Sequence, residues 1–230
     1  MIKTSKQTTL KQLRKIPVTP PVNAGGYWKG IAHAELLDMV KHHWPTIYNQ
    51  TVVTKNNGTE MIAAAQVLHL HKDYQVRGGV PFLAIRNSYS GHVATRLFAG
   101  FYLIDTMASL CCTEYFLGKH TVDRKEMDEQ MAAGTRWINR QYTENAKKLR
   151  AMEMMVLDTV KDVEPLLLHA ARVGLLSWSR LRLVDQKYHS GPPTAFHLLH
   201  AFAQVSQKSP PLNQLGYIHD FWQLLTKEQK

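Results

Sequence analysis

Cysteine is scarce in this sequence, with two in 230 residues. Cys111 and Cys112 are adjacent, and neighbouring residues of a strand point to opposite faces of a sheet. A disulfide between them would therefore need strained geometry. We expect two reduced thiols in the core.

Long hydrophobic runs are also missing. No apolar run approaches the roughly 18 residues that a membrane span requires, so we expect no transmembrane helix and no membrane partner. The first residues, MIKTSKQTTLKQLRK, are basic, and no apolar segment follows them, which argues against a secretory signal. These absences predict a cytoplasmic protein.

The motifs of nucleotide hydrolysis and of serine hydrolysis are absent. Gly25-Gly26 and Gly78-Gly79 lack the spacing of a dinucleotide-binding loop, and neither pair is followed by the Lys-Ser/Thr of a phosphate loop. There is no G-x-S-x-G elbow either. We therefore expect a non-enzymatic protein that needs no cofactor.

Metal-ligand motifs are sparse although the chain has 12 histidines. Neither C-x-x-C nor H-E-x-x-H occurs. His69 and His71 would share one strand face and in principle suit a divalent ion, but we expect them to be structural and predict no metal site. A metal-dependent nuclease built on Asp105, Glu114 and Lys119 stays open as an alternative, because carboxylates with a lysine suit phosphodiester cleavage.

Positive charge is what the sequence has in excess. Lys and Arg number 28 against 18 Asp and Glu, a net charge of +10. Residues 1–16 contain five of these Lys and Arg residues and no Asp or Glu. Such a surplus is typical of a polyanion binder, most often of nucleic acid, whereas the alternative for the N-terminal bases is a solubilising tail. Prolines and glycines in residues 17–26 predict that residues 1–26 form a disordered basic arm.

Hydrophobic periodicity divides the rest of the chain into strands followed by helices. Asn56-Asn57-Gly58 marks a hairpin between two strands, and residues 80–117 contain three more strand-like segments. From residue 123 to about residue 158, apolar residues recur at helical spacing and predict one long helix with a single buried stripe. Shorter helical segments are expected at residues 32–43, 166–187, 195–207 and 215–227.

We therefore predict an α+β fold. An antiparallel meander of four or five strands is packed by one long helix and followed by a helical C-terminal part. The predicted division is an arm at residues 1–26, an α+β core domain at residues 27–160 and a helical subdomain at residues 161–230.

Basic residues at strand edges and on the long helix are the candidate ligands of nucleic acid. Those predicted to contact phosphates are Arg86, Arg96, Lys119, Arg136, Arg140, Lys147 and Lys148. Tyr89, in a polar turn between strands, is expected to be exposed and to stack on a base. The alternative for the helix charges is an ordinary solvated face.

Three short motifs resemble the phage/plasmid-like protein family, a domain of unknown function. They are Arg86-Asn87-Ser88, Asp105 within residues 103–109, and Lys119-His120-Thr121. With the helix after Thr194, they cover about residues 60–225 in the order and spacing of that family. Ser90, Ile104 and Thr106 differ from the family's usual Asp, Cys and Asn. The resemblance implies a phage or plasmid origin, and hence the host cytoplasm, but no activity.

The roles of Asn87, Ser88, Asp105 and His120 stay open between a ligand site and a network that satisfies strand ends. In the second case Asn87 makes the turn and Asp105 pairs with Arg86 or His120.

The order of strands and long helix is also similar, more loosely, to the core of Rad52-type phage single-strand annealing proteins. In those proteins a basic groove between sheet and helix holds the strand, and the chains form rings. That likeness implies single-stranded DNA binding or annealing in recombination or replication, by a homo-oligomer. The alternative is a phage inhibitor that binds and blocks a host defence or replication protein through its basic surface.

Overall fold

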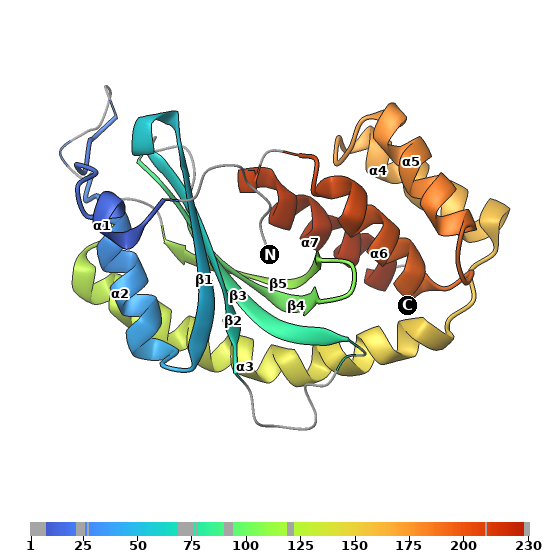
Figure 1. The fold of residues 1–230 in the computed structure, drawn as a ribbon, viewed down its shortest axis with the longest axis horizontal. Helices are drawn as coiled ribbons and strands as arrows, with labels where there is room; N and C mark the ends of the chain where they lie inside the picture. The colour runs from blue at the N-terminus through green and yellow to red at the C-terminus, as the bar shows by residue number, and fades with distance from the viewer. Residues whose placement is uncertain are drawn as a thin grey trace.

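The computed structural model describes residues 8–21, 26, 28–68, 76, 78–89, 94–118, 122–209 and 211–227. Within them, one five-stranded sheet is covered by helices on both faces (Figure 1). The predicted α+β class is confirmed. The predictions made for His69, His71, Lys119 and His120 fall outside the described residues.

The sheet is a meander in which every strand pairs antiparallel with the next, in the order β1-β2-β3-β4-β5. Asn57 and Gly58 in the first turn have φ of 55° and 89°, the left-handed region that Asn and Gly tolerate best. The predicted hairpin is therefore confirmed. The strands are β1 Ile47–Lys55, β2 Glu60–Val67, β3 Gly79–Ser88, β4 Thr95–Leu103 and β5 Ala108–Gly118.

The helices also begin and end near the predicted positions. Asp123 caps the long helix by accepting a hydrogen bond from the Glu126 amide at 2.9 Å, and Thr194 caps a later one in the same way. A π-helical turn at Thr159–Val163 precedes α4. The helices are α1 Leu10–Leu13, α2 His33–His43, α3 Arg124–Met154, α4 Glu164–Arg172, α5 Trp178–His189, α6 Ala195–Ser206 and α7 Pro211–Lys227.

The two faces of the sheet carry different helices. Gly134 of α3 lies so close to Tyr115 and Leu97 that a Cβ there would meet the tyrosine ring at 2.8 Å. On the other face, Nε2 of His219 on α7 is 4.0 Å from a carboxylate oxygen of Glu114. Since side chains alternate along a strand, α3 and α7 enclose the sheet from opposite sides. Figure 1 shows α3 running beneath the strands, with α6 and α7 together at one end.

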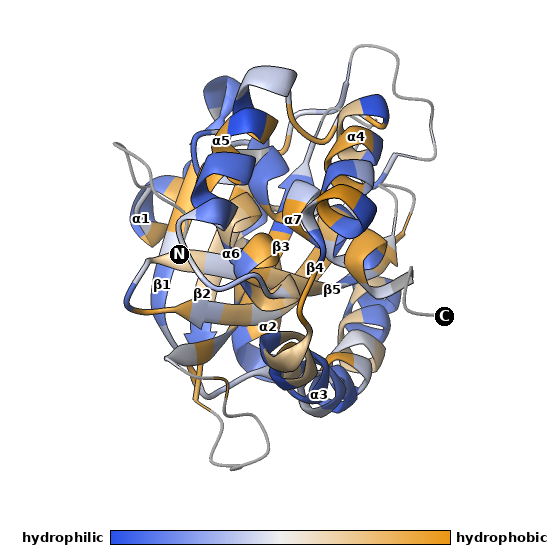
Figure 2. Ribbon diagram, turned by 90° about the vertical axis from the view of Figure 1, so that its right-hand side faces the viewer, coloured by the Kyte–Doolittle hydropathy of each residue, from blue (hydrophilic) through white to orange (hydrophobic). Residues whose placement is uncertain are grey.

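One hydrophobic cluster joins the sheet to helices on both sides of residue 160, the predicted domain boundary. It includes Phe202 and Phe221, whose rings stack with centroids 3.9 Å apart. Figure 2 shows hydrophobic residues concentrated in the middle of the molecule, while α3 is largely hydrophilic on its outer side.

The expected disordered arm is wrong for residues 8–16. Thr9 and Gln12 form a capping box that starts α1, and the Thr8 amide donates to the Val52 carbonyl at 2.9 Å. Leu13 is 1% exposed, so this apolar side chain anchors the segment to the core. The buried, unbridged Cys111 and Cys112 confirm the prediction of core thiols. No described helix combines the length and hydrophobicity that a membrane span needs.

Candidate nucleic-acid interface

The outer face of α3 carries the first group of predicted phosphate ligands. Arg136, Arg140 and Lys147 are all exposed, and their spacing of four and seven residues places them on one side of the helix. The opposite side holds the buried stripe that includes Ile138 and Leu149. Lys147 pairs with Glu144 at 3.1 Å, but both side chains are more than half exposed, so solvent weakens that pair. The outer face therefore presents a basic row about 17 Å long.

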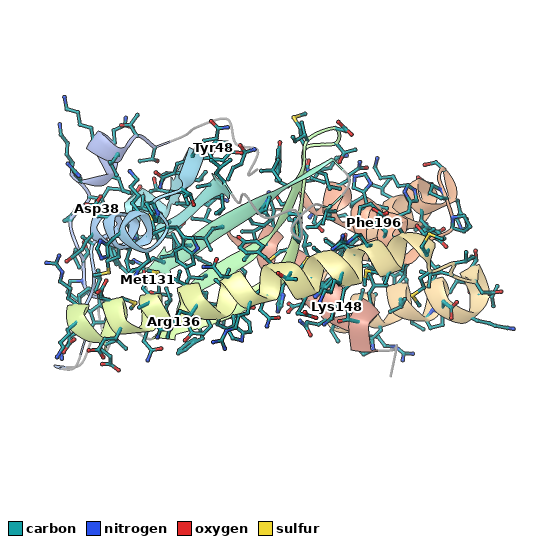
Figure 3. All side chains as sticks on the ribbon, turned by 90° about the horizontal axis from the view of Figure 1, so that it is seen from below. Asp38, Tyr48, Met131, Arg136, Lys148 and Phe196 are labelled. Atoms are coloured by element: carbon teal, nitrogen blue, oxygen red, sulfur yellow. The ribbon has the colours of Figure 1, made fainter. Side chains whose placement is uncertain are left out.

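An exposed tryptophan borders this basic row. Trp137 is 38% exposed, and its ring lies against Tyr115 of β5 with centroids 5.5 Å apart. Lys148 follows eleven residues later, which is close to three turns, so it shares the same flank of the helix. Figure 3, which looks onto α3, shows Arg136 and Lys148 on its outer side. Exposed aromatic rings beside Arg and Lys are the usual components of single-strand binding surfaces.

The second group lies on the far face of the sheet. The pairing register places Arg86 opposite Arg96, and Arg96 opposite Phe116, across β3, β4 and β5. Their neighbours Leu97 and Tyr115 contact α3, so alternation directs this row toward the α7 side. Phe116 is 51% exposed. The structure thus joins two predicted arginines to an aromatic residue, and we call these three residues the arginine row.

Charges are incompletely balanced in the arginine row. The guanidinium of Arg96 donates to the carboxylate of Glu114. Arg86 forms no such pair with any described carboxylate, and its buried Nε has no hydrogen-bond partner. Burial lowers the pKa of Arg86, opposed by Glu60 and assisted by Arg96. Two like charges opposite each other on one face cost free energy, which an anionic ligand would recover.

Helix α7 closes one side of the row with a histidine and a carboxyl group. Burial lowers the pKa of His219, and the charge of Arg96 lowers it further while Glu114 opposes both. His219 is therefore neutral at pH 7 and adds no positive charge. Burial also raises the pKa of the neighbouring Asp220.

The predicted stacking residue Tyr89 lies elsewhere. Tyr89 is 1% exposed, so the prediction is wrong. Its hydroxyl accepts a hydrogen bond from the His33 amide at 2.8 Å, and its ring stacks on the His33 imidazole with centroids 4.2 Å apart. It looked exposed in the sequence because polar residues surround it, yet β3 continues to Ser88 and brings it against α2.

Asn87 and Ser88 belong to the same buried strand end rather than to a turn. The Asn87 amide donates to Nδ1 of His33 at 2.9 Å and accepts from the Thr95 hydroxyl at 2.8 Å, while His33 donates through Nε2 to the Gly58 carbonyl. Asn87 and Ser88 are at most 1% exposed. This network ties β3, β4 and the first hairpin to α2, which is a structural role.

Asp105 lies at the opposite end of the sheet from Arg86, so the predicted pairing of these two residues is wrong. Asp105 is exposed in the turn after β4 and faces Gly78, just before β3, whereas Arg86 stands eight residues further along the chain, roughly 26 Å away. The turn is fastened to α6, because Thr106 donates to Nε2 of His200 at 2.7 Å.

The structure also separates the two carboxylates of the nuclease alternative. Glu114 pairs opposite Phe98, and five further residues of β4 lead to Leu103, just before Asp105. That is a separation of roughly 17 Å. Among the described residues no three His, Cys, Asp or Glu side chains gather as a metal site would require.

The groove that the Rad52-type likeness implied between sheet and helix is closed here. The contact of Gly134 with Tyr115 leaves no space, and Tyr142 donates across the same interface to the Phe82 carbonyl at 2.6 Å. A hollow of about 790 Å³ between α1, α2 and the start of α3 is lined by ionic residues that pair with one another, such as Arg14 with Asp38 at 3.6 Å. Neither feature offers a basic channel.

Comparisons of the chain with protein-family models, with curated proteins and with solved structures find no match. The resemblance to the phage/plasmid-like family therefore stays a prediction. The sequence analysis selected neither Trp137 nor His33, and it did not choose Phe116 as a site residue because large aromatic residues in strands are usually core. One signal in the sequence could have identified Trp137. It lies outside the buried stripe of the helix, between Arg136 and Arg140.

Proposed function

We propose that this chain binds single-stranded nucleic acid, with DNA favoured, along the outer face of α3, and that it does so without catalysis. The observation that carries the proposal is the exposed row of Arg136, Arg140 and Lys147 beside the exposed ring of Trp137. The basic side chains contact successive phosphates of the strand, and the indole ring of Trp137 stacks on a nucleobase.

Single strands are favoured over duplexes because the exposed ring of Trp137 cannot stack on a base that is paired within a duplex. Paired bases are stacked on each other inside a duplex, whereas an unpaired base is free to stack on an indole. Annealing in phage or plasmid recombination or replication, by a homo-oligomer, is the setting that the sequence resemblances add to this proposal.

The test is a fluorescence anisotropy titration of a labelled single strand. The triple variant Arg136→Gln, Arg140→Gln, Lys147→Gln should bind at least tenfold more weakly than the wild type at low salt. The matched control removes the same charge elsewhere, through Lys161→Gln, Arg172→Gln and Lys187→Gln, three exposed positions on other helices. Equal losses in both triple variants would show that only net charge matters, which would contradict the proposal.

A second candidate function is inhibition of a host defence or replication protein. The observation that favours it is the group of exposed apolar side chains Val160, Leu168 and Trp178, 67%, 38% and 57% exposed, which line a hollow of about 550 Å³ beside α4 and α5. Exposed apolar patches of this kind mark protein interaction sites. A pull-down from nuclease-treated host lysate that retains one stoichiometric partner, and loses it with Trp178→Ser, would support this candidate.

A further inference from the structure

The arginine row is open at one end and closed at the other. At the closed end, Ile62 of β2 pairs opposite Arg86 and is 0% exposed. Exposure then rises along the row, from the half-buried Arg86 through the 44% exposed side chain of Arg96 to Phe116 at 51%. A ligand must therefore enter from the side of β5, the edge strand of the sheet.

A closed end selects a particular kind of phosphate. A phosphodiester within a strand needs an exit for the chain on both sides, and the buried Ile62 blocks one of them. A terminal phosphate needs only one exit. It also carries about 1.5 to 2 negative charges at pH 7, so it suits two adjacent guanidinium groups better than a singly charged diester does.

The open end suits the base and the rest of the strand. Phe116 lies two strands from Arg86, about 10 Å, a span that one nucleotide covers. Tyr115, the residue before Phe116 on β5, contacts Trp137 on α3. The exposed rings of Trp137 and Phe116 therefore lie on opposite faces of the same edge strand. A strand lying on α3 can thus pass around β5 and end on the arginine row.

We propose that Arg86, Arg96 and Phe116 bind the terminal phosphate monoester of a nucleic-acid strand, with the guanidinium groups on the phosphate and the phenyl ring on the last base. This inference deepens the proposed function and rests on it for the path of the strand. The same phosphate chemistry occurs in a free nucleoside monophosphate, so the experiment must separate the two sources.

The experiment compares strands of one sequence with a 5′-phosphate, with a 3′-phosphate and with hydroxyl groups at both ends, by anisotropy with an internal label. We expect one phosphorylated strand to bind about tenfold more tightly than the hydroxyl strand. Arg86→Gln and Phe116→Ala should each remove that difference, and the exposed Phe116 is a site where truncation leaves the core intact. Equal affinity for all three strands would overturn the inference.

Two further arms keep the inference distinct from the proposed function. Arg140→Gln, on α3, should weaken the binding of all three strands by the same factor. The preference for the phosphorylated strand over the hydroxyl strand should then be unchanged. A titration with nucleoside monophosphate alone addresses the arginine row without any strand. If no strand binds, saturable binding of the nucleotide that Arg86→Gln abolishes would support the row and reject the α3 proposal, whereas no nucleotide binding would reject both.

Discussion

Arg86 and Arg96 stand directly opposite each other on β3 and β4. Glu114 forms an ion pair with Arg96 and, together with Glu60, also attracts the charge of Arg86, whose buried Nε has no hydrogen-bond partner among the described residues. A sheet built only for stability would gain by replacing one of these arginines, because like charges in this position repel and an unpaired buried polar atom costs free energy. The pair therefore combines two like charges with an unsatisfied buried atom, both of which cost stability.

Replacement of Arg86 should stabilise the protein. We expect Arg86→Met to raise the free energy of unfolding by about 0.5–1 kcal/mol, since it removes the repulsion and the unsatisfied group while keeping the aliphatic volume. Arg96→Met is the matched control. It should lower the free energy of unfolding, because it leaves Glu114 without its guanidinium partner. Urea denaturation measures both. A destabilised Arg86→Met would show that this arginine is structural.

Removal of the Tyr89 hydroxyl should lower stability without affecting binding. Tyr89→Phe removes the hydroxyl that accepts a hydrogen bond from the buried His33 amide, which we expect to cost about 1–2 kcal/mol. Strand affinity should change less than twofold. Tyr48→Phe, at a partly exposed tyrosine of β1, is the control for loss of a hydroxyl alone. Unchanged stability together with weaker strand binding would restore Tyr89 as a ligand.

Alanine at position 134 should destabilise although alanine is the better helix former. Propensity favours Gly134→Ala by roughly 1 kcal/mol, but the new Cβ would lie 2.8 Å from the Tyr115 ring, and such overpacking costs about 1–3 kcal/mol. We expect a net loss by thermal or urea unfolding. The added substitution Tyr115→Leu should recover part of it, and a more stable single variant would contradict the close packing of α3.

Stability should fall in mild acid through His200. Burial lowers the pKa of His200 to about 4 from the ordinary 6.5, with smaller contributions from His197 and Lys187. Between these two values the unfolded chain binds the proton and the folded chain does not, so the free energy of unfolding decreases as pH falls from about 6.5 to 4. With a discount for partial exposure, the decrease is about 1–2 kcal/mol.

The difference between wild type and His200→Gln isolates this effect, because His219 titrates in the same direction in both proteins. We expect urea midpoints that converge as the pH falls from 6.5 to 4. Parallel pH profiles would contradict a His200 that is kept neutral by burial and by its contact with Thr106.

Local signals were sufficient to predict the fold class. Asn57 and Gly58 specify their turn through backbone conformations that few other residues adopt, and the apolar spacing of α3 identifies its buried stripe. The two signals act over a few residues, so a single sequence contains them. The anchoring of α1 depends on Leu13 reaching a core formed much later in the chain, and no local pattern reveals that.

The candidate site was less predictable because it depends on strand register. Arg86, Arg96 and Phe116 become neighbours only when three strands pair at one offset, and a shift of one residue would reverse the face of each. His33 meets Asn87 across 54 positions of sequence. The separation of Asp105 from Arg86 follows directly from an antiparallel meander, and the predicted topology already contained that information.

The most direct test of strand binding on α3 is the salt dependence of single-strand association, measured for the wild type and for the triple variant of Arg136, Arg140 and Lys147. The logarithm of the association constant should fall linearly with the logarithm of salt concentration, and the triple variant should have a slope shallower by about 2, from roughly 0.7 for each lost phosphate contact. No association at low salt, or the same slope in both proteins, would contradict the account.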